Sequence, residues 1–388
     1  MKYLKLLSLL YFTFLSLTAL AEYEYELIEE DRHKIHVIVI DPNEYEVSLV
    51  AAHDQVFGRE KVGDIAKRRN SQIAVNAGFF QIGENQDGRP TGTLVSDGQV
   101  FGMRVSKHGC FIKTGDKFSV EMVTPFLEVT AGDEVIRPKK YNRSAKGRDV
   151  FFFNSKWGPS TLSDYNNRKE VIIDRNLKVI KIAKHGGNEI PAGGYVLSFP
   201  VNHDLSYITT GQKLKFSWHP GYLAEKNGFA VMGLPVLIMD DKIADNLPNK
   251  EHHARTAVGT NKDGNLVLVV AEHVYKKNIT EIGISDIKKV IENKNLSLDN
   301  LKASDVKKIL LEDLSSDSPV IGLTIAELAR FMKEKGCIAA INLDGGGSST
   351  MYIEGKYVNQ SFGDIDEAEG LKIVRPVSDA LVFKKKIK

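Results

Sequence analysis

The sequence has little cysteine and no strong excess of charge of either sign. Of its 388 residues only 2 are cysteines, and 52 Lys and Arg side chains face 50 Asp and Glu, a formal net charge of +2. Two cysteines form at most one bridge, which excludes a small disulfide-stapled scaffold. The near-neutral balance argues against a nucleic-acid-binding protein that relies on bulk positive charge. At this length the chain can bury a sizeable core, in one large domain or two smaller ones.

The two cysteines are Cys110 and Cys337. They could form one disulfide in an oxidising compartment, but Cys337 begins a strongly apolar segment. A buried free thiol is therefore at least as consistent with the sequence as a bridge.

Long apolar runs are also absent, with one exception at the start of the chain. Lys2 and Lys5 precede an apolar run that ends in Ala19-Leu20-Ala21, and no cysteine follows to receive a lipid. This pattern predicts a secretory signal peptide over residues 1–21, cleaved after Ala21, because the run is short for a bilayer span. Cleavage would leave 50 basic and 50 acidic side chains. We expect a secreted or periplasmic protein without a membrane span.

What the sequence does have is short hairpins. Turn pairs separate alternating apolar segments at Asp97-Gly98, Asp263-Gly264 and Glu354-Gly355. Helices are fewer, and the clearest is "TIAELARFMKEKG", where Thr324 and Glu327 form a capping-box pattern and Gly336 supplies the stop. These features predict an α+β fold, a mixed and mostly antiparallel, hairpin-rich β-sheet core with packed helices.

The domain organisation follows from composition. After the signal peptide we expect one domain over residues 22–388. Within it, residues 105–225 read as a β-rich subdomain with polar turns, and residues 276–318 as a polar helical insertion with narrow apolar seams.

The first segment that points to chemistry is "INLDGGGSST". An apolar strand runs into Asp344, then Gly345, Gly346 and Gly347, then Ser348 and two more hydroxyls. Unhindered backbone N–H groups beside a strand-terminal carboxylate can hold an anion. A nucleotide-binding P-loop is excluded because no lysine lies in the loop and a strand follows, and a serine-hydrolase elbow fails similarly.

Two further segments carry polar groups at strand ends. In "VNAGFFQIGENQDGRPTG" Asn76 ends a short apolar strand, and Phe79 or Phe80 offers a ring face to a sugar, although at least one of the two rings is expected in the core. In "NKEHHARTAVGT" Arg255 enters a hairpin, and its planar fork suits a phosphate or carboxylate. The adjacent His252 and His253 would point to opposite faces of a strand, and no zinc-binding pattern is present.

Together and in this order behind the predicted signal peptide, "NAGFF…PTG", "RTAVG" and "GLTIAELARFM…INLDGGGSST" resemble the phosphodiester glycosidase family, whose members include an N-acetylglucosamine-1-phosphodiester α-N-acetylglucosaminidase and bacterial exopolysaccharide-related proteins. The similarity covers roughly residues 60–104, 228–275 and 318–383. It implies a secreted hydrolase of sugar 1-phosphodiesters, acting on polysaccharide or a glycoconjugate, whose cleft is built from three loops. The residues that match these motifs are Asn76, Gly78, Phe80, Thr91, Gly92, Arg255, Thr256, Gly259, Asp344, Gly345, Gly346, Gly347 and Ser348.

A phosphate ester is a stable leaving group, so cleavage of the sugar C1–O bond needs little protonation and relaxes the usual demand for two carboxylates. We expect Asp344 to be nucleophile, base or stabiliser of the oxocarbenium-like state, and Arg255 to bind the phosphate. The N–H groups of Gly345–Gly347 with Ser348 would hold the anion, and Asn76 and Thr91 would orient the sugar.

The chain departs from the family pattern after the second motif. Many members carry Asp-Gly-Arg there, whereas this chain has Glu272-His273. Glu272 is therefore a further substrate-binding candidate, with Asp240 and Glu84 as additional carboxylates.

Two other functions remain open. The cleft could bind phosphorylated or acidic polysaccharide without catalysis, or the protein could be a metal-dependent phosphodiesterase. The sequence identifies no cofactor with certainty. The acid-rich segments "ENQDG" and "MDDKIAD" make Ca²⁺ or Mg²⁺ conceivable, although no complete ligand set is visible.

Overall fold

A computed structural model of the chain describes residues 23–30, 32–273, 320–360, 364–365 and 372–387, with the single positions 288, 291, 292 and 302. The predicted signal peptide over residues 1–21 and nearly all of the predicted insertion over residues 276–318 lie outside these ranges. Within the described ranges no helix has the length and apolarity needed to cross a membrane.

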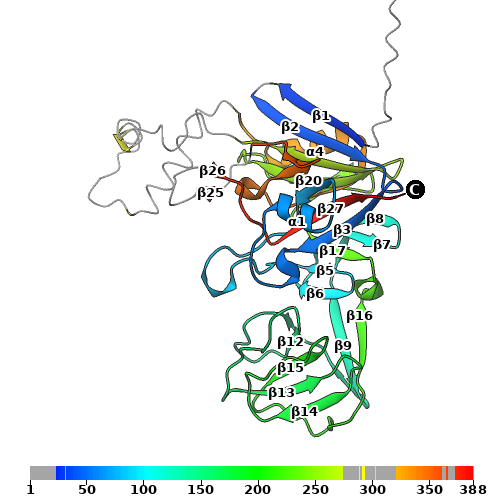
Figure 1. Cartoon of the computed structure of the whole chain (residues 1–388), viewed down its shortest axis with the longest axis vertical. Helices are drawn as coiled ribbons and strands as arrows, with labels where there is room; N and C mark the ends of the chain where they lie inside the picture. Colours follow the sequence, from blue (N-terminus) through cyan, green and yellow to red (C-terminus); the bar gives the residue numbers. More distant parts are fainter. Residues whose placement is uncertain are drawn as a thin grey trace, which may run out of the picture.

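A large antiparallel sheet of seven strands organises the upper part of the molecule (Figure 1). A five-stranded antiparallel sheet contributes the strand ends that complete the candidate site. In spatial order, the seven-stranded sheet comprises β1 (Tyr23–Glu30), β2 (His33–Ile40), β21 (Leu266–Ala271), β20 (Arg255–Asn261), β22 (Cys337–Asn342), β18 (Val236–Met239) and β19 (Lys242–Ile243). The five-stranded sheet comprises β24 (Lys356–Tyr357), β23 (Met351–Ile353), β4 (Ile73–Asn76), β27 (Asp379–Lys385) and β3 (Tyr45–Ala51).

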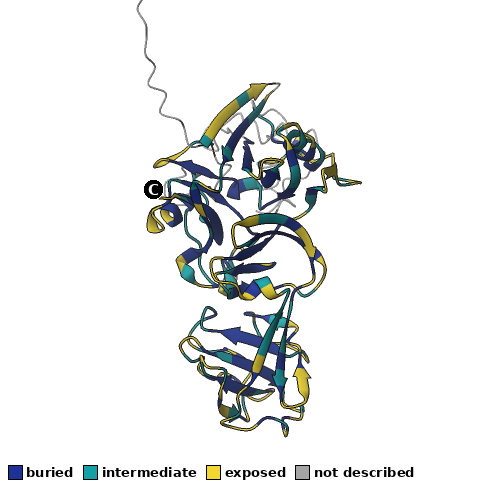
Figure 2. Ribbon diagram, turned by 90° about the vertical axis from the view of Figure 1, so that its right-hand side faces the viewer, coloured by how far each residue is buried: buried dark blue, intermediate teal, exposed yellow. Residues whose placement is uncertain are grey.

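Side-chain alternation along β20 shows how these layers pack. Ala257 belongs to the apolar cluster shared with helix α4 (Ile325–Glu334), whereas the next residue, Val258, belongs to the core shared with the five-stranded sheet. Successive strand residues point to opposite faces, so the seven-stranded sheet is buried on both sides. Helix α1 (Val62–Arg68) covers the outer face of the five-stranded sheet through a separate cluster that includes Ile65. Figure 2 shows the buried residues concentrated along the strands.

Two more groups of strands extend the molecule downward in Figure 1. The long strands β9 and β16 belong to the lower group and run up toward the upper group. The upper group is a five-stranded sheet of β6 (Gln99–Gly102), β5 (Leu94–Ser96), β17 (Phe229–Met232), β7 (His108–Thr114) and β8 (Lys117–Val123). The lower group comprises β11 (Lys140–Tyr141), β12 (Phe151–Asn154), β15 (Tyr195–Pro200), β13 (Arg168–Ile173) and β14 (Val179–Ala183), with a three-stranded sheet of β10 (Glu134–Ile136), β9 (Phe126–Ala131) and β16 (Lys215–His219). The short elements are β25 (Asp364–Ile365), β26 (Lys372–Ile373) and the 3₁₀ turns η1 (Ala52–Asp54), η2 (Glu84–Gln86), η3 (Gly221–Ala224) and η7 (Gly346–Ser348).

The strands of the predicted subdomain, residues 105–225, therefore divide between two groups, since β7 and β8 pair within the upper sheet. A buried asparagine pair joins the two groups. Asn142 and Asn154 both donate their side-chain amides to the carbonyl of Val100 on β6, at 2.6 and 2.9 Å. The Asn142 amide also donates to the Asn154 side-chain oxygen at 3.0 Å, which fixes β11 and β12 against β6.

The mostly antiparallel, hairpin-rich core is confirmed, because β11–β12 is the one parallel pairing between the described strands. Asp97-Gly98 and Glu354-Gly355 form the expected tight turns, with positive φ at both residues of each pair. The capping box of Thr324 and Glu327 is also confirmed. The predicted α+β class overestimated the helix content. Only α1 and α4 are α-helices with bounds in the described part of the chain, and the fold there is predominantly β.

Candidate active site

Asn76 joins the three motifs at one point. It lies at the end of β4, and its side chain is 1% exposed. Its side-chain oxygen accepts from the Thr256 hydroxyl of β20 at 2.8 Å and from the backbone N–H of Thr350 at 3.0 Å. Its amide donates to the backbone carbonyl of Asp344 at 2.7 Å. Asn76 therefore holds the loops in register, and both acceptor positions of its side-chain oxygen are filled by protein donors. Its predicted contact with sugar remains untested.

The glycine loop begins where β22 ends. Asp344 is partly exposed, and its backbone N–H donates to the Ala77 carbonyl at 2.9 Å. The N–H of Gly345 donates to the Asp344 carboxylate at 3.0 Å, and the Ser348 hydroxyl donates to the same carboxylate. The loop thus folds back on its own carboxylate and fixes the direction of that side chain.

This folding changes the roles expected for the loop donors. The Gly345 N–H binds Asp344, and the Gly346 N–H donates to the Ala254 carbonyl at 2.8 Å. Both donors are occupied by protein acceptors, and Ser348 holds the carboxylate. Within the described residues, the buried hydroxyl oxygens of Ser349 and Thr350 have no hydrogen-bond partner, and the predicted anion contacts of the loop remain untested.

A second carboxylate, Asp379, lies at the start of β27, and the sequence motifs did not include it. It is 1% exposed and accepts from the Gly78 N–H at 2.6 Å and from the Ser378 hydroxyl. Gly78 leaves the room for it, since a Cβ at that position would lie 3.0 Å from Asp379 Oδ2 and 3.3 Å from Val231 Cγ2. The glycine of the first motif therefore serves a close approach between two strands.

The two carboxylates are electrically linked. The pKa of Asp344 is raised to about 6, chiefly by burial, with a smaller contribution from the negative charge of Asp379 and against the hydrogen bonds from Ser348 and Gly345. Burial likewise raises the pKa of Asp379 to about 6. A desolvated pair of carboxylates with raised pKa values is typical of sites that move a proton, because such acids exchange protons closer to neutral pH than ordinary carboxylic acids do.

Arg375 is a cation that acts on Asp344. Its charge lowers the pKa of Asp344, opposing the larger effect of burial. Its guanidinium lies over Gly347, where a Cβ would come within 2.5 Å of Arg375 Cζ. The partly exposed Arg375 and Asp344 thus present a positive fork and a carboxylate beside bare backbone.

Arg255, the cation expected from the second motif, has other partners. Its Nε donates to the Leu323 carbonyl at 3.0 Å and its Nη2 to the Glu251 carbonyl at 3.1 Å. Thr256, the next residue on β20, faces Asn76, so the Arg255 side chain leaves the opposite face of the strand. The structure brings its backbone to the site, with Arg255 Cα 3.9 Å from a Cβ built on Gly345. Its predicted phosphate contact remains untested.

The remaining residues of the first and second motifs surround this centre. Phe80 bridges to Pro90 and packs against the α1 cluster. The N–H and hydroxyl of Thr91 both donate to the Phe79 carbonyl, at 2.9 and 3.1 Å. Gly92 packs against Met232, where a Cβ would lie 2.4 Å from Met232 Cε. These contacts position the loop that follows Gly78.

Glu272 is buried at 1% exposure and is bound by protein groups. It accepts from His36 Nε2 at 2.7 Å and from the Gln360 N–H at 2.9 Å. Asp240 occupies the turn between β18 and β19 with a positive φ. Among the described residues, no three His, Cys, Asp or Glu side chains converge as a metal-ligand set. The Ca²⁺ or Mg²⁺ prediction thus has no donor set in that part of the chain.

Arg375 and Asp379 are candidate functional residues that sequence reasoning missed. Both lie in "KIVRPVSDALVF", near the end of the chain. The one available signal is a carboxylate at the mouth of an apolar strand, the same pattern that marks Asp344. It is weak without the contact to Gly78, which lies 301 residues earlier.

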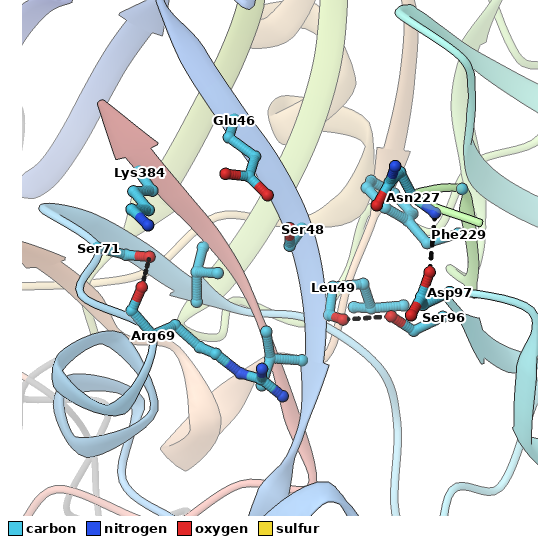
Figure 3. Close-up of a pocket in the computed structure, with 13 residues that line it drawn as sticks. Glu46, Ser48, Leu49, Arg69, Ser71, Ser96, Asp97, Asn227, Phe229 and Lys384 are labelled. Carbon is cyan, nitrogen blue, oxygen red and sulfur yellow. Dashed lines mark hydrogen bonds between the residues drawn. The ribbon is translucent and has the colours of Figure 1, made fainter. Parts of the chain in front are cut away.

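A separate cavity of about 320 Å³ opens between β3, the β5–β6 turn and β17, and it contains none of the motif residues (Figure 3). Glu46 and Lys384 give it mixed charge. Its Asp97 carboxylate accepts from the Asn227 N–H at 2.9 Å, and the Ser96 hydroxyl donates to the Leu49 carbonyl at 2.6 Å. Several of its polar groups are therefore already paired, and it is distinct from the Asp344 site.

Solved structures share this fold at low sequence identity. A hypothetical protein from Synechocystis aligns over 94% of this chain with a TM-score of 0.66 and 17% identity, and this chain spans 62% of that one. A putative exported protein from Burkholderia pseudomallei aligns over 91% of this chain and 74% of its own, with a TM-score of 0.63 and 20% identity. At these identities the likeness concerns the fold alone.

Comparison of the sequence identifies the family as well as the fold. An uncharacterized protein of Rickettsia conorii is 33% identical over 280 residues, which are 69% of this chain and 99% of that protein. Residues 167–298 and 308–384 match the family model described as phosphodiester glycosidase. These ranges include Asp344, Arg375 and Asp379, whereas the Asn76 motif precedes them. The chain belongs to the phosphodiester glycosidase family.

Proposed function

We propose that this protein is a secreted or periplasmic glycoside hydrolase that cleaves the C1–O bond of a sugar 1-phosphodiester on envelope or extracellular polysaccharide or on a glycoconjugate. The observation that carries the proposal is the arrangement of two desolvated carboxylates, Asp344 and Asp379, beside the guanidinium of Arg375. The predicted signal peptide supports export.

In the proposed reaction, Arg375 binds the phosphate and Asp344 reacts at the sugar. The sugar C1–O bond breaks, and its electron pair stays on the phosphate oxygen, whose negative charge the guanidinium balances. The oxygen of a water molecule ends up on C1, and the proton that this water loses passes to a carboxylate. The leaving phosphate monoester needs no proton, so one ionised carboxylate at the sugar suffices.

The difference in exposure supports different roles for the two acids. Asp344 is partly exposed and can reach substrate, whereas Asp379 is enclosed by Gly78 and Ser378. Asp344 is accordingly the catalytic carboxylate. Asp379 is a positioning residue that tunes the proton affinity of Asp344 through its charge.

Product analysis on a panel of sugar 1-phosphodiesters tests the proposal. Cleavage at carbon releases free sugar and leaves the phosphate on the aglycone, whereas cleavage at phosphorus releases sugar 1-phosphate. Detection of sugar 1-phosphate, or activity abolished by chelator and restored by Mg²⁺ or Ca²⁺, would establish the metal-dependent phosphodiesterase instead. Retention of a phosphorylated polysaccharide with no product of either kind would establish a binding protein.

Asp344→Asn removes the proposed reacting carboxylate while keeping its size. We expect kcat to fall at least about a hundredfold, with a much smaller change in KM, because the amide cannot accept a proton or support positive charge at C1. Asp116→Asn, at an exposed turn between β7 and β8, is the matched control. Full turnover in the Asp344 variant would remove this residue from the mechanism.

A further inference from the structure

Five cationic side chains line one cavity of about 370 Å³ beside the candidate site. It is enclosed by the loop at residues 89–92, the segment at residues 102–106 after β6, and residues 139–143 around β11. The cations are Arg89, Arg104, Lys139, Lys140 and Arg143, and no Asp or Glu contributes to the lining. The volume is at the lower end for small-ligand sites.

These charges are not balanced by nearby carboxylates. Within the described part of the chain, none of the five takes part in a salt bridge of 4.0 Å or less. Arg89 donates through its terminal nitrogens to the Pro90 carbonyl and to Gln81 Oε1, both at 3.1 Å, but its buried Nε has no acceptor. The charge of Arg143 acts on Arg89 unfavourably. Like charges gathered in this way lower stability unless an anion occupies the cavity.

The walls of the cavity are held in place. Asn142, in the same turn as Lys140 and Arg143, donates its side-chain amide to Val100 on β6 at 2.6 Å. The Tyr141 hydroxyl donates to the Pro138 carbonyl at 3.0 Å and accepts from the Leu127 N–H at 3.0 Å. Because these bonds fix the backbone between Lys139 and Arg143, the cations have a preorganised frame.

The cavity lining is connected to the loop that binds Asp379. Thr91, which lines it, donates to the Phe79 carbonyl, and Phe79 directly follows Gly78, whose N–H binds Asp379. One Cα step and one hydrogen bond therefore separate the cavity lining from Gly78, a span within roughly 10 Å. An extended ligand of that length would be needed to occupy both places.

We propose that this cavity is a subsite for a further phosphate group of the substrate, so that the preferred substrate is a glycan carrying several phosphates. The inference rests on the proposed function and specifies its substrate class. Arginine forks bind phosphate oxygens in pairs and lysines add point charge, which suits phosphate better than a single carboxylate.

Calorimetric titration of the mature chain with inorganic tripolyphosphate tests the subsite without turnover. We expect binding that weakens at least tenfold in Lys140→Ala/Arg143→Ala. Lys117→Ala/Lys215→Ala removes the same charge from two exposed positions outside the cavity and should bind as the wild type does. Equal weakening in both double variants, or equal affinity in both, would overturn the subsite. Tighter binding of oligogalacturonate than of tripolyphosphate would overturn the choice of phosphate.

Thermal unfolding provides a second measurement. Without anion, Lys140→Ala/Arg143→Ala should unfold at the same or a higher temperature than the wild type, because like charges are removed, and tripolyphosphate should no longer raise its midpoint. A lower midpoint without anion would contradict the repulsion argument. Tripolyphosphate binding lost only in the cavity variant, in a protein that releases no free sugar from any substrate, would refute the proposed function and leave the anion subsite standing.

Discussion

The candidate active site depends on a few residues whose ordinary chemistry is altered by burial. Asp344 and Asp379 are common carboxylic acids, yet both have pKa values raised to about 6 because water is excluded around them. Gly78 permits this by leaving space for Asp379, and Asn76 holds the loop that presents Asp344. Single substitutions at these residues can therefore test their effects on catalysis and stability.

The pH dependence of catalysis should report the coupling of the two acids. The rise of kcat/KM with pH is expected near pH 6 in the wild type, since the proposed reaction uses Asp344 in its ionised form. Asp379→Asn removes a charge that raises the pKa of Asp344, so the rise should move to lower pH. A pH profile from 4 to 8 checks this, and an unmoved rise with unchanged kcat would show that Asp379 has no influence on Asp344.

The same substitution predicts a change in stability with a definite sign. The folded state binds a proton at Asp379 up to about pH 6, whereas the unfolded chain releases it near the ordinary value of 3.8. Wild-type stability therefore falls as pH rises between these values and is level above them. Asn cannot ionise, so the variant does not share this loss. The difference in unfolding free energy, Asp379→Asn minus wild type, should therefore rise by on the order of 2 kcal/mol from pH 4 to pH 7. Urea denaturation at both pH values measures the gain, and its absence would argue against a raised pKa.

Gly78→Ala should disturb the carboxylate pair through contact alone. The added Cβ would lie 3.0 Å from Asp379 Oδ2 in a fully buried place, so we expect about 1–3 kcal/mol of destabilisation. Gly221→Ala is the control, because nothing lies within 4 Å of a Cβ there. Unfolding midpoints in urea compare the two, and equal stability would mean that the strands adjust without cost.

At the scale of elements, helix α4 helps to position the glycine loop that begins at Asp344. Its apolar face packs through Leu328, Ala329 and Met332 against the seven-stranded sheet, and the chain turns at Gly336 directly into β22. β22 then delivers Asp344 at its end. The capping box of Thr324 and Glu327 stabilises the N-terminus of α4, and it thereby supports the position of β22.

Thr324→Ala removes the side chain that caps α4. We expect a loss of about 1 kcal/mol in unfolding free energy, since the Glu327 N–H loses its acceptor. Thr209→Ala, at an exposed turn, changes the same side chain without removing a cap. Chemical denaturation followed by circular dichroism measures the unfolding free energy of both variants. An equal decrease in the two would show that the Thr324 cap does not stabilise the protein.

At the scale of the whole molecule, the core is built from sheets that bury both cysteines. Cys110 and Cys337 are free and 0% exposed, so the alternative of a disulfide between them is wrong for this structure. Cys110 lies in the core shared with the lower strands, and Cys337 lies in the cluster beneath α4. Burial raises the pKa of the Cys337 thiol to about 12.

A thiol count tests this arrangement. Ellman's reagent should find almost no reactive thiol in the native protein, because both side chains are enclosed and protonated, and two thiols after unfolding in guanidinium. The count after unfolding serves as the internal control. Finding none in the unfolded, non-reduced protein would demonstrate a disulfide.

Local interactions explain why parts of the fold could be predicted. Asp97-Gly98 and Glu354-Gly355 define hairpins because both residues adopt positive φ, and α4 follows from its cap and its periodicity. The loop at Asp344 was visible for the same reason, since three consecutive glycines after an apolar strand form a local pattern. The predominance of β structure over the expected α+β balance was less visible, because short strands give weak periodicity.

The sequence by itself determined the hairpins, α4 and the glycine loop, since all depend on residues near one another in the chain. Only the tertiary structure decided which groups meet at Asp344. It brought Asp379 to Gly78 across 301 residues and laid Arg375 over Gly347, because β27 pairs beside β4. It also directed Arg255 toward carbonyl groups on the face of β20 opposite Thr256, since neighbouring strand residues point to opposite sides.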